Sequence, residues 1–356
     1  MAMIKGTNNS ETKYGTAFVD TIYGYGGNDS LYGRAGSDTI WGGVGNDKIW
    51  GDAGNDTLRG EDGTDFVYGG DGNDLIYGGS GNDTLYGDAG TDTIYGGAGN
   101  DVIKGGTGIS HLYGGSGNDS LYYDPTTENI SKLGSYLSTT TLDGGANYDT
   151  LYVYSRATYT ETGTGLVKPA QVEIDIGYDT NTLYFEGPRR QDPFIKAGTF
   201  TNIEKIVAGG NTAIDFWGSH EDRGMTVIGS SARDTFNSSY ANDIMDGGAG
   251  DDRFNMWEGT GVDIIYSTET DNDTFYFTAY DGAAAKINGF NGEGVARGDK
   301  LIFSVYKDMW PEPPESLLTV SESGNRTFFD FDNGAIYAEV DAVGLKPGLD
   351  YAFEVL

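Results

Sequence analysis

The sequence has no cysteine and only two histidines among its 356 residues. Without cysteine, the chain can form neither a disulfide framework nor a thiolate metal site, and it has no cysteine nucleophile. His220 is followed by a glutamate, as in the helical zinc motif of metalloproteases, but the second histidine of that motif is absent. No G-x-S-x-G nucleophile motif occurs either. These absences exclude the common zinc, thiol and serine hydrolase sites.

Basic residues are also scarce, with 22 Lys and Arg against 54 Asp and Glu, a formal net charge of −32. Nucleic acids and anionic membranes both require a basic face, so neither is expected as a partner. No apolar run approaches the length of a membrane span, and Met1–Asn9 lacks the apolar stretch of a secretory signal. On these facts alone the protein would be placed in the cytosol.

Glycine, in contrast, is abundant, and much of it lies in a repeat. From Gly15 to Tyr122 one nine-residue unit is written twelve times without insertion or deletion, for example at 42–50, 69–77 and 78–86. Glycine at the first, second and fourth places permits positive φ and close backbone approach, so six residues form a tight turn. The last three places predict a short strand.

The sixth place of the unit carries a carboxylate in every copy except the one with Ser110. So many anions at equivalent points of a compact turn would repel one another unless a cation lay among them. Carboxylates with backbone carbonyls form a hard oxygen site that suits calcium rather than zinc or copper. The candidate ligands in this block are Asp20, Asp29, Asp38, Asp47, Asp56, Asp65, Asp74, Asp83, Asp92, Asp101 and Asp119.

The eighth place is aliphatic in all twelve units, from Ile22 to Leu121. Side chains alternate across a strand, so this residue points inward while the seventh and ninth point outward. One buried side chain per unit is a thin core, and stability must come from stacked neighbours and bound ions. A disordered Gly/Asp-rich linker would have no reason to keep this pattern.

These units resemble the haemolysin-type calcium-binding (RTX) nonapeptide G-G-x-G-x-D-x-U-x. The resemblance implies an all-β fold, a parallel β-roll in which two units make one turn of the coil and several Ca²⁺ ions lie between successive turns. It also implies export from a Gram-negative cell by a type I secretion channel, directed by an uncleaved C-terminal signal. Such sites need calcium at roughly 10⁻⁴ to 10⁻³ M, which an extracellular location provides. Residues 350–356 are similar to such a tail, although an ordinary final strand would read the same way.

The remaining chain extends or closes this block. Residues 1–14 contain a degenerate first repeat, with almost nothing before it to cover the end of the coil, and the RTX block occupies 15–122. Residues 123–228 predict irregular β coils with insertions, or alternatively a small β-sandwich, with a short helix possible at 129–137 and one returning unit at 144–152 that contributes Asp149.

A second, degenerate calcium block is expected at 229–276. Its candidate ligands are Asp234, Asp243, Asp252, Asp263 and Asp273. Residues 277–356 predict a C-terminal β cap, in which Thr327–Val340 forms a hairpin around Asn333 and Gly334.

The ninth place is mostly aromatic, and a two-unit coil would gather these rings into two outer ladders. Three functions remain open. The first, which we favour, is a non-enzymatic secreted protein that folds on meeting calcium and assembles with itself, head to tail or laterally, in a surface layer, biofilm matrix or filament. The second is a lectin-like adhesin that holds exopolysaccharide or a cell surface through the aromatic ladders. The third is a polysaccharide-modifying enzyme using acids in 123–228, where Glu173, Asp175, Glu186, Asp215 and Glu221 are available.

Overall fold

Every named element in the described part of the chain is a β-strand. The computed structural model describes residues 1–108, 110–123, 140–154, 158–160, 167–169, 172–176, 181–185, 195–201, 203–210, 212–218, 224–256, 262–267, 271–278, 283–288, 290, 299–305, 318–323, 326–331, 336–340, 345 and 351–355. Within these ranges no helix is long and apolar enough to cross a membrane. The chain divides into two compact units, Met1–Lys168 with Gly187–Lys205, and Pro169–Glu186 with Ile206–Leu356.

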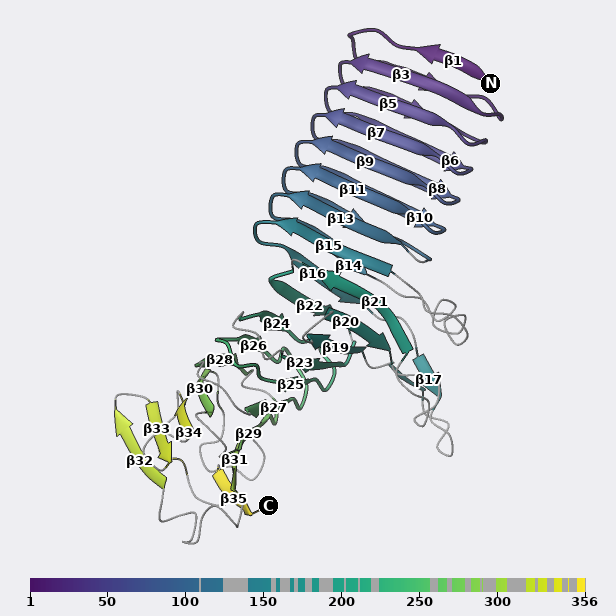
Figure 1. Cartoon of the computed structure of the whole chain (residues 1–356). Coiled ribbons are helices and arrows are strands. Elements are labelled where there is room, and N and C mark those ends of the chain that lie inside the picture. Colours follow the sequence, from purple (N-terminus) through teal and green to yellow (C-terminus); the bar gives the residue numbers. More distant parts are fainter. Residues whose placement is uncertain are drawn as a thin grey trace. The chain divides into compact units, whose positions relative to one another are not determined.

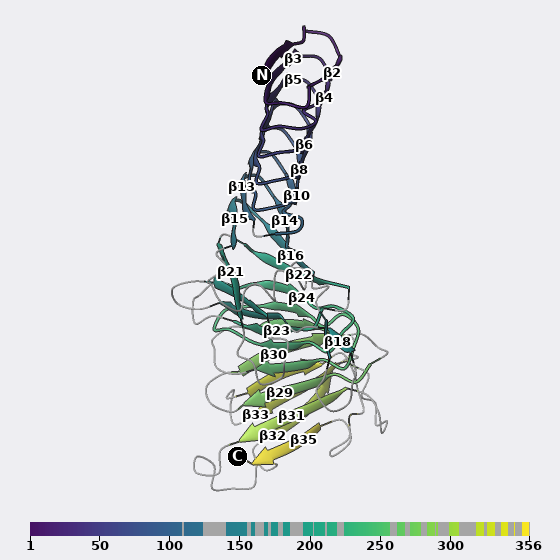
Figure 2. The same ribbon diagram turned by 90° about the vertical axis from the view of Figure 1, so that its right-hand side faces the viewer.

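The first unit is a coil with two parallel sheets (Figures 1 and 2). One sheet contains β1 (Ala2–Lys5), β3 (Asp20–Gly26), β5 (Thr39–Val44), β7 (Thr57–Asp62), β9 (Leu75–Ser80), β11 (Thr93–Ala98), β13 (His111–Ser116), β15 (Thr140–Ala146) and β21 (Ile195–Thr201). The other contains β2 (Thr12–Tyr14), β4 (Ser30–Tyr32), β6 (Lys48–Ala53), β8 (Phe66–Asp71), β10 (Thr84–Ala89), β12 (Val102–Lys104), β14 (Ser120–Tyr123) and β16 (Thr150–Tyr154).

Each strand of the repeat block pairs with the strand two units away, so equivalent residues lie 18 positions apart. Ile22 lies opposite Ile40, and Leu85 lies opposite Val67 and Ile103. All twelve eighth-place side chains are at most 1% exposed, and they form the core between the two sheets. The predicted coil of two units and its single inward residue per unit are therefore confirmed.

The strands are longer than the three residues expected from the repeat. Most run on through the first three places of the next unit, as β5, β8 and β9 do. These glycine-rich residues pair between coils as well, for example Gly43 opposite Glu61 and Val44 opposite Asp62. Backbone hydrogen bonds between coils, which need no side chain, extend the sheet where hydrophobic patterning gives no signal.

The ninth-place aromatic side chains stack along both faces of the repeat block. Tyr32 and Trp50 have ring centroids 4.4 Å apart and planes within 1°, and Tyr68 and Tyr86 follow at 4.8 Å and 5°. At Arg59 the aromatic pattern is interrupted, and the guanidinium group takes the place of a ring. Its Cζ atom lies 4.2 Å from the centroid of the Tyr77 ring. The predicted ladders are thus confirmed.

The returning unit at 144–152 continues the coil despite the break in sequence period. Strand β15 pairs with β13, β16 pairs with β14, and the Asp119 N–H donates to Asp149 Oδ1 at 2.7 Å. The coil therefore keeps its register while the intervening residues are inserted. The helix expected at 129–137 lies outside the described residues. Strands β17 (Thr158–Thr160) and β18 (Val167–Pro169) form a separate two-stranded sheet.

The second unit also contains long runs of parallel pairing. One run passes through β19 (Val172–Ile176), β23 (Ile214–Trp217), β25 (Thr235–Asn237), β27 (Arg253–Met256), β29 (Thr274–Thr278), β31 (Lys300–Val305) and β35 (Tyr351–Val355), with β20 (Asn181–Phe185) antiparallel to β19. The other passes through β24 (Thr226–Ile228), β26 (Ile244–Asp246), β28 (Asp263–Tyr266), β30 (Ala283–Asn288) and β34 (Ile336–Val340). Strand β22 (Lys205–Gly209) precedes them.

The parallel pairing makes this unit a solenoid, and its core contains a row of stacked phenylalanines that the first unit does not have. Phe236, Phe254 and Phe275 are fully buried and stack at 4.8 and 5.0 Å. Strands β32 (Leu318–Ser323) and β33 (Arg326–Phe331) are antiparallel, and β33 pairs antiparallel with β34, as the hairpin prediction requires. The cap role of this region stays a prediction, and β35 shows that the C-terminal residues form a strand.

Candidate metal centre

The sixth-place aspartates form two hydrogen-bonded columns along the turns of the first unit. Each backbone N–H donates to Oδ1 of the aspartate one coil further on, as from Asp47 to Asp65 at 2.7 Å and from Asp65 to Asp83 at 2.8 Å. The aspartates of the repeat block are between 0% and 3% exposed. The columns therefore hold one oxygen of each carboxylate in a fixed position inside the turn.

The second oxygen of these carboxylates, Oδ2, faces the turn without a hydrogen-bond donor. A buried anionic oxygen without a partner is strongly unfavourable unless a proton or a cation neutralises it. In the described first unit this arrangement recurs at Asp29, Asp38, Asp47, Asp56, Asp65, Asp74, Asp83, Asp92, Asp101 and Asp119.

Burial accordingly raises the pKa of these groups, and backbone donors offset only part of the effect. The pKa rises to about 7 for Asp56, Asp65, Asp83 and Asp92. It rises to about 6 for Asp47, Asp74, Asp101 and Asp119. For most of these groups, neighbouring carboxylates raise the pKa further. Without an ion, each of these carboxyl groups therefore keeps its proton to a higher pH than a free aspartate does. A bound cation would lower the pKa again.

The first-place glycine leaves a cradle beside Oδ2. A Cβ built on Gly33 would lie 2.6 Å from Asp38 Oδ2 and 2.7 Å from the carbonyl oxygen of Gly51, one coil further on. Carboxylate and carbonyl oxygens thus converge on a space that a side chain would fill. Hard oxygen donors with flexible coordination suit Ca²⁺, so the residues present fit the predicted ion.

The second place sets the backbone shape of the turn. Gly43, Gly70 and Gly79 have φ of 110°, 104° and 120° there, and the non-glycine residues Asp52 and Glu61 are also held at positive φ. Positive φ is unfavourable for residues with a Cβ, so the fold enforces this shape where glycine is missing. In this conformation the second-place residue, which follows the cradle glycine, makes no hydrogen bond to the carboxylate Oδ2.

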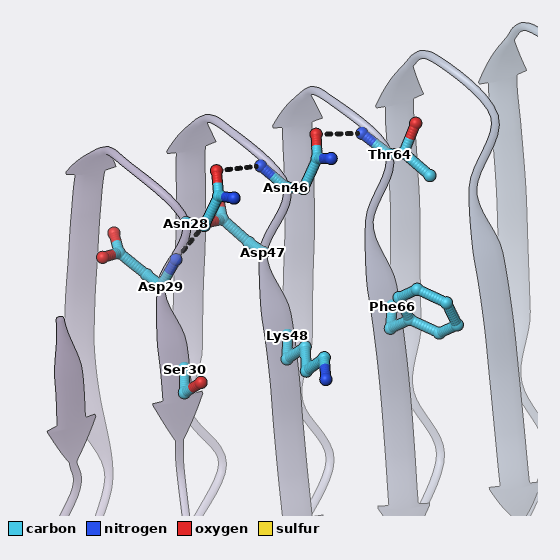
Figure 3. Close-up of a pocket in the computed structure, with 8 residues that line it drawn as sticks. All are labelled: Asn28, Asp29, Ser30, Asn46, Asp47, Lys48, Thr64 and Phe66. Carbon is cyan, nitrogen blue, oxygen red and sulfur yellow. Dashed lines mark hydrogen bonds between the residues drawn. The ribbon is translucent and has the colours of Figure 1, made fainter. Parts of the chain in front are cut away.

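The fifth place contributes a further ladder that the repeat motif does not specify (Figure 3). Asn46 N–H donates to Asn28 Oδ1 at 3.0 Å, and Thr64 N–H donates to Asn46 Oδ1 at 3.0 Å. Together with Asp29, Asp47 and neighbouring side chains, these residues line a shallow groove along the turns. These bonds need no ion, and their direction is opposite to that of the aspartate columns.

Ser110 leaves a gap in one aspartate column. Its hydroxyl is 3.4 Å from the Gly105 carbonyl oxygen, which accepts the hydrogen bond within the same turn. The next residue in the column is Thr140, because His111 lies opposite Thr141. Two consecutive coils therefore lack the carboxylate at this side of the roll.

The second unit has aspartate columns of its own, although the sequence spacing is longer there. Asp234 N–H donates to Asp252 Oδ1, Asp252 N–H donates to Asp273 Oδ1, and Asp273 N–H donates to Asp299 Oδ1, each at 2.8 Å. Asp243 N–H donates to Asp263 Oδ1 at 2.9 Å. The predicted ligands are thus placed in equivalent positions, but their second oxygens differ.

Asp252 Oδ2 is buried without a donor, and burial raises its pKa to about 9. By contrast, serine donors reach Oδ2 of Asp234, Asp243 and Asp273. Asp20 in the first unit shares this arrangement, with Thr16 as donor. Calcium binding by these four aspartates and by Asp149 and Asp263 stays a prediction.

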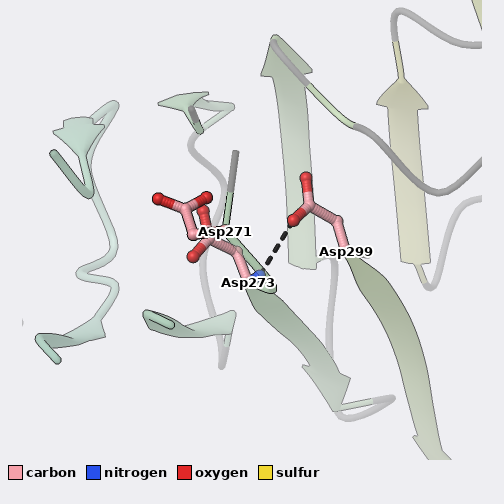
Figure 4. Close-up of side chains that lie close together, drawn as sticks. All are labelled: Asp271, Asp273 and Asp299. Carbon is pink, nitrogen blue, oxygen red and sulfur yellow. Dashed lines mark hydrogen bonds between the residues drawn. The ribbon is translucent and has the colours of Figure 1, made fainter. Parts of the chain in front are cut away.

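Three acids that the repeat motif did not identify extend this picture. Glu204 Oε2 accepts the Asp149 N–H at 2.8 Å, so a glutamate continues the column that contains Asp119 and Asp149. Carboxylate oxygens of Asp271, Asp273 and Asp299 lie within 4.8 Å of one another (Figure 4). The Ser267 hydroxyl is 2.7 Å from Asp273 Oδ2 and 2.9 Å from Asp299 Oδ2. Glu204 and Asp299 both stand two places before a buried apolar residue, a spacing that would have revealed them.

The acids considered for catalysis do not form a described pair. Glu173 and Asp175 lie on β19, which pairs with β20 and β23, while Glu186 and Glu221 lie outside the described residues. Burial raises the pKa of Asp215, and Asn237 Nδ2 donates to its Oδ1 at 3.1 Å. Asp215 therefore has a structural partner in the sheet.

The chain matches the family model described as RTX calcium-binding nonapeptide repeat (4 copies) at residues 6–40, 14–49, 32–67, 41–76, 68–103, 95–125 and 228–262. Among solved structures, it is similar to the extracellular lipase LipA from Serratia marcescens, with 16% identity and a TM-score of 0.18. That similarity covers 84% of this chain and 43% of the lipase chain, and its TM-score is too low to support an inference about function. A comparison with curated proteins finds no match.

The raised pKa values predict that acid partly replaces calcium. For the eight aspartates whose folded pKa is about 6 or 7, this value exceeds the ordinary 3.8, so the stability that they contribute to the ion-free roll is complete below pH 4 and is lost as pH rises through 6 to 7. Far-UV circular dichroism in EDTA should show more β-structure at pH 5 than at pH 8, with light scattering as the control for aggregation. An ion-free β signal that is equal at both pH values, or stronger at pH 8, would contradict this.

The gap at Ser110 predicts that a carboxylate there adds a site. In Ser110→Asp the new side chain would accept the Asp92 N–H and lie beside Gly105, where the serine hydroxyl lies now, whereas Ser110→Asn has nearly the same shape without the charge. Native mass spectrometry should count about one more calcium per chain only in Ser110→Asp, and calcium at about 100-fold above Kd should add about 2 to 3 kcal/mol of stability. Equal counts in both variants would show that the cradle is not sufficient.

Proposed function

We propose, from the premise that this chain carries RTX calcium-binding nonapeptide repeats, that it is a non-enzymatic protein exported by type I secretion that folds when it meets extracellular calcium. In this proposal the folded roll serves as a rigid structural element of a cell surface, biofilm matrix or filament. The observation that carries it is the column of buried, donor-free aspartate oxygens beside glycine cradles.

The electrostatics explain why folding would wait for calcium. The net charge is −32, and folding brings buried carboxylates to the spacing of adjacent strands. Inside a cell, where free calcium is far below roughly 10⁻⁴ M, the ionised columns oppose winding of the coil. Outside, ion binding supplies free energy directly to folding, because no preformed site exists in the unfolded chain. An extended chain is also the form that a secretion channel can pass.

The aromatic ladders favour a structural role over sugar binding. A sugar ring stacks on the face of an aromatic side chain, but the faces of Tyr32, Trp50 and Tyr68 are covered by their neighbours at 4.4 and 5.7 Å. The rings thereby hold the sheet, and their edges face outward. Polysaccharide binding remains the alternative, and it would need a surface other than the stacked faces.

Self-assembly is supported by apolar side chains left on the outside of the repeat block. Tyr25, Val44 and Phe66 are 46%, 62% and 38% exposed. Tyr25 and Val44 lie on the neighbouring strands β3 and β5 of one sheet, and Phe66 lies on β8 of the other. Together these side chains form an exposed apolar surface that a second copy could cover. We propose that calcium-loaded rolls associate through this surface.

Calcium-driven folding predicts different effects for two neighbouring aspartates. Asp65 is fully buried and lacks a donor at Oδ2, whereas Asp62 is exposed on the outside of the same unit. In a calcium titration at pH 8 followed by circular dichroism, Asp65→Asn should raise the calcium midpoint, because one site loses its anionic ligand. Asp62→Asn removes the same charge and should change stability by less than about 0.5 kcal/mol. Full β signal in EDTA, before any calcium is added, would refute the proposed function.

Assembly predicts that larger particles form only in the folded, calcium-loaded state. Sedimentation velocity and negative-stain electron microscopy at millimolar calcium should show oligomers or fibres that disperse in EDTA. Magnesium at equal ionic strength is the control, since its smaller ion and octahedral demand fit the cradles poorly. Monomers alone at millimolar calcium would remove the structural-assembly part of the proposal.

A further inference from the structure

In the described part of the chain, four turns have a hydroxyl residue at the second place that contacts the carboxylate. In each, this residue is serine or threonine, and the carboxylate stands at the sixth place of the unit. We call them hydroxyl-closed turns; the pairs are Thr7 with Glu11, Thr16 with Asp20, Ser230 with Asp234, and Ser239 with Asp243.

In all four turns the backbone N–H of the second-place residue donates to the sixth-place carboxylate. In the second turn, Thr16 N–H and hydroxyl donate to Asp20 Oδ2 at 2.6 and 2.8 Å, and Phe18 N–H donates to the hydroxyl at 3.2 Å. In the fourth, Ser239 N–H and hydroxyl donate to Asp243 Oδ2 at 3.0 and 2.7 Å, and Ala241 N–H donates to the hydroxyl at 3.1 Å.

The other two turns repeat the pattern. Ser230 N–H donates to Asp234 Oδ2 at 2.7 Å, with Ala232 N–H donating to the Ser230 hydroxyl at 2.9 Å. Thr7 N–H and hydroxyl donate to the two carboxylate oxygens of Glu11 at 2.9 and 3.1 Å. The hydroxyl-closed turn occurs in both compact units, with two hydroxyl residue types and two acids. We therefore relate it to the serine or threonine at the second place of the repeat.

The open turns have the opposite features. None of the four hydroxyl residues has a positive φ, whereas second-place residues of the open turns do, whether they are glycine or not. Asp252 is an internal comparison, because its unit follows that of Ser239 directly in sequence. Its second place is Gly248, with φ of 82°, and Asp252 Oδ2 is buried without a donor.

The hydroxyl-closed turns therefore do not fit the calcium site that the open turns offer. Oδ2 of Asp20 and of Asp243 already accepts an N–H and an O–H. Oδ2 of Asp234 accepts an N–H, and each carboxylate oxygen of Glu11 accepts one donor. Each of these donors carries a hydrogen that would repel a cation. Two hydrogen bonds also satisfy the carboxylate, so ion binding would first have to break them.

We propose that the second-place residue selects between two ways of closing the turn: serine or threonine closes it without calcium, and glycine or another residue held at positive φ leaves it for calcium. Asp20, Asp234 and Asp243 then act as calcium-independent parts of the columns. This inference rests on the proposed calcium-driven folding. It divides the turns into those that need calcium in order to fold and those that do not.

Glu61 allows the decisive exchange because it already lies at positive φ, 79°, in an open turn and is exposed. Glu61→Ser should supply the hydroxyl that closes onto Asp65, whereas the matched control Glu61→Ala lacks it. Native mass spectrometry of the full chain in calcium should count about one ion fewer in Glu61→Ser than in Glu61→Ala. In the reverse exchange, Ser239→Gly should gain about one ion over wild type.

Hydrogen–deuterium exchange in EDTA at pH 8 gives an independent readout on wild type. Peptides that span Ser230–Asp243 should exchange more slowly than those that span the open turns between Gly42 and Asp101. The proposal is overturned if Glu61→Ser and Glu61→Ala bind equal numbers of ions, or if both groups of peptides exchange equally fast. If instead the wild type binds no calcium and both groups are protected in EDTA, it is the proposed function that fails.

Discussion

The structure depends on the unequal treatment of the two oxygens of each sixth-place carboxylate. One oxygen accepts a backbone N–H from the preceding coil, which fixes the side chain, and the fixed geometry then holds the other oxygen against a glycine cradle. The aspartate cannot turn outward to water without breaking the column. Neutralisation of that second oxygen, by a proton or by a cation, therefore favours winding of the coil, and calcium is the cation that we propose for the open turns.

The hydrophobic core alone does not stabilise the coil. Each nine-residue repeat buries one aliphatic side chain, which is too little to offset the entropy lost when nine residues are ordered. Aromatic stacking, the asparagine ladder and inter-coil backbone bonds add to stability at each interface between coils. The second unit replaces Ile and Leu by stacked Phe residues, and it is in this unit that serine closes two of the turns.

Much of the first compact unit could be predicted because the same residue types recur at the same places of every nine-residue repeat. Strict nine-residue spacing predicts from the sequence alone that Ile49 points inward and that Asp47 lies in the turn as a candidate ligand. The fifth-place asparagines were not predicted, since a single Asn in a turn has many uses and its partner lies 18 residues away. Glu204 and Asp299 were missed because insertions hide the period, although the spacing from acid to apolar residue survives. The hydroxyl-closed turns could not be foreseen from a motif that treats substitution at the second place as degeneration.

The two ladders also give the coil a direction. In the aspartate columns the N–H of one coil is satisfied by the side chain of the next coil, whereas in the asparagine ladder the N–H of the next coil is satisfied by the side chain of the one before. A coil at the end of a growing stack therefore has donors or acceptors that only its neighbour can complete. Stability of this kind belongs to interfaces rather than to units, so the nearest-neighbour description of repeat proteins applies. An ion bound between coils, as we propose, would strengthen the same interface, so ion binding and winding of the coil would form one cooperative process.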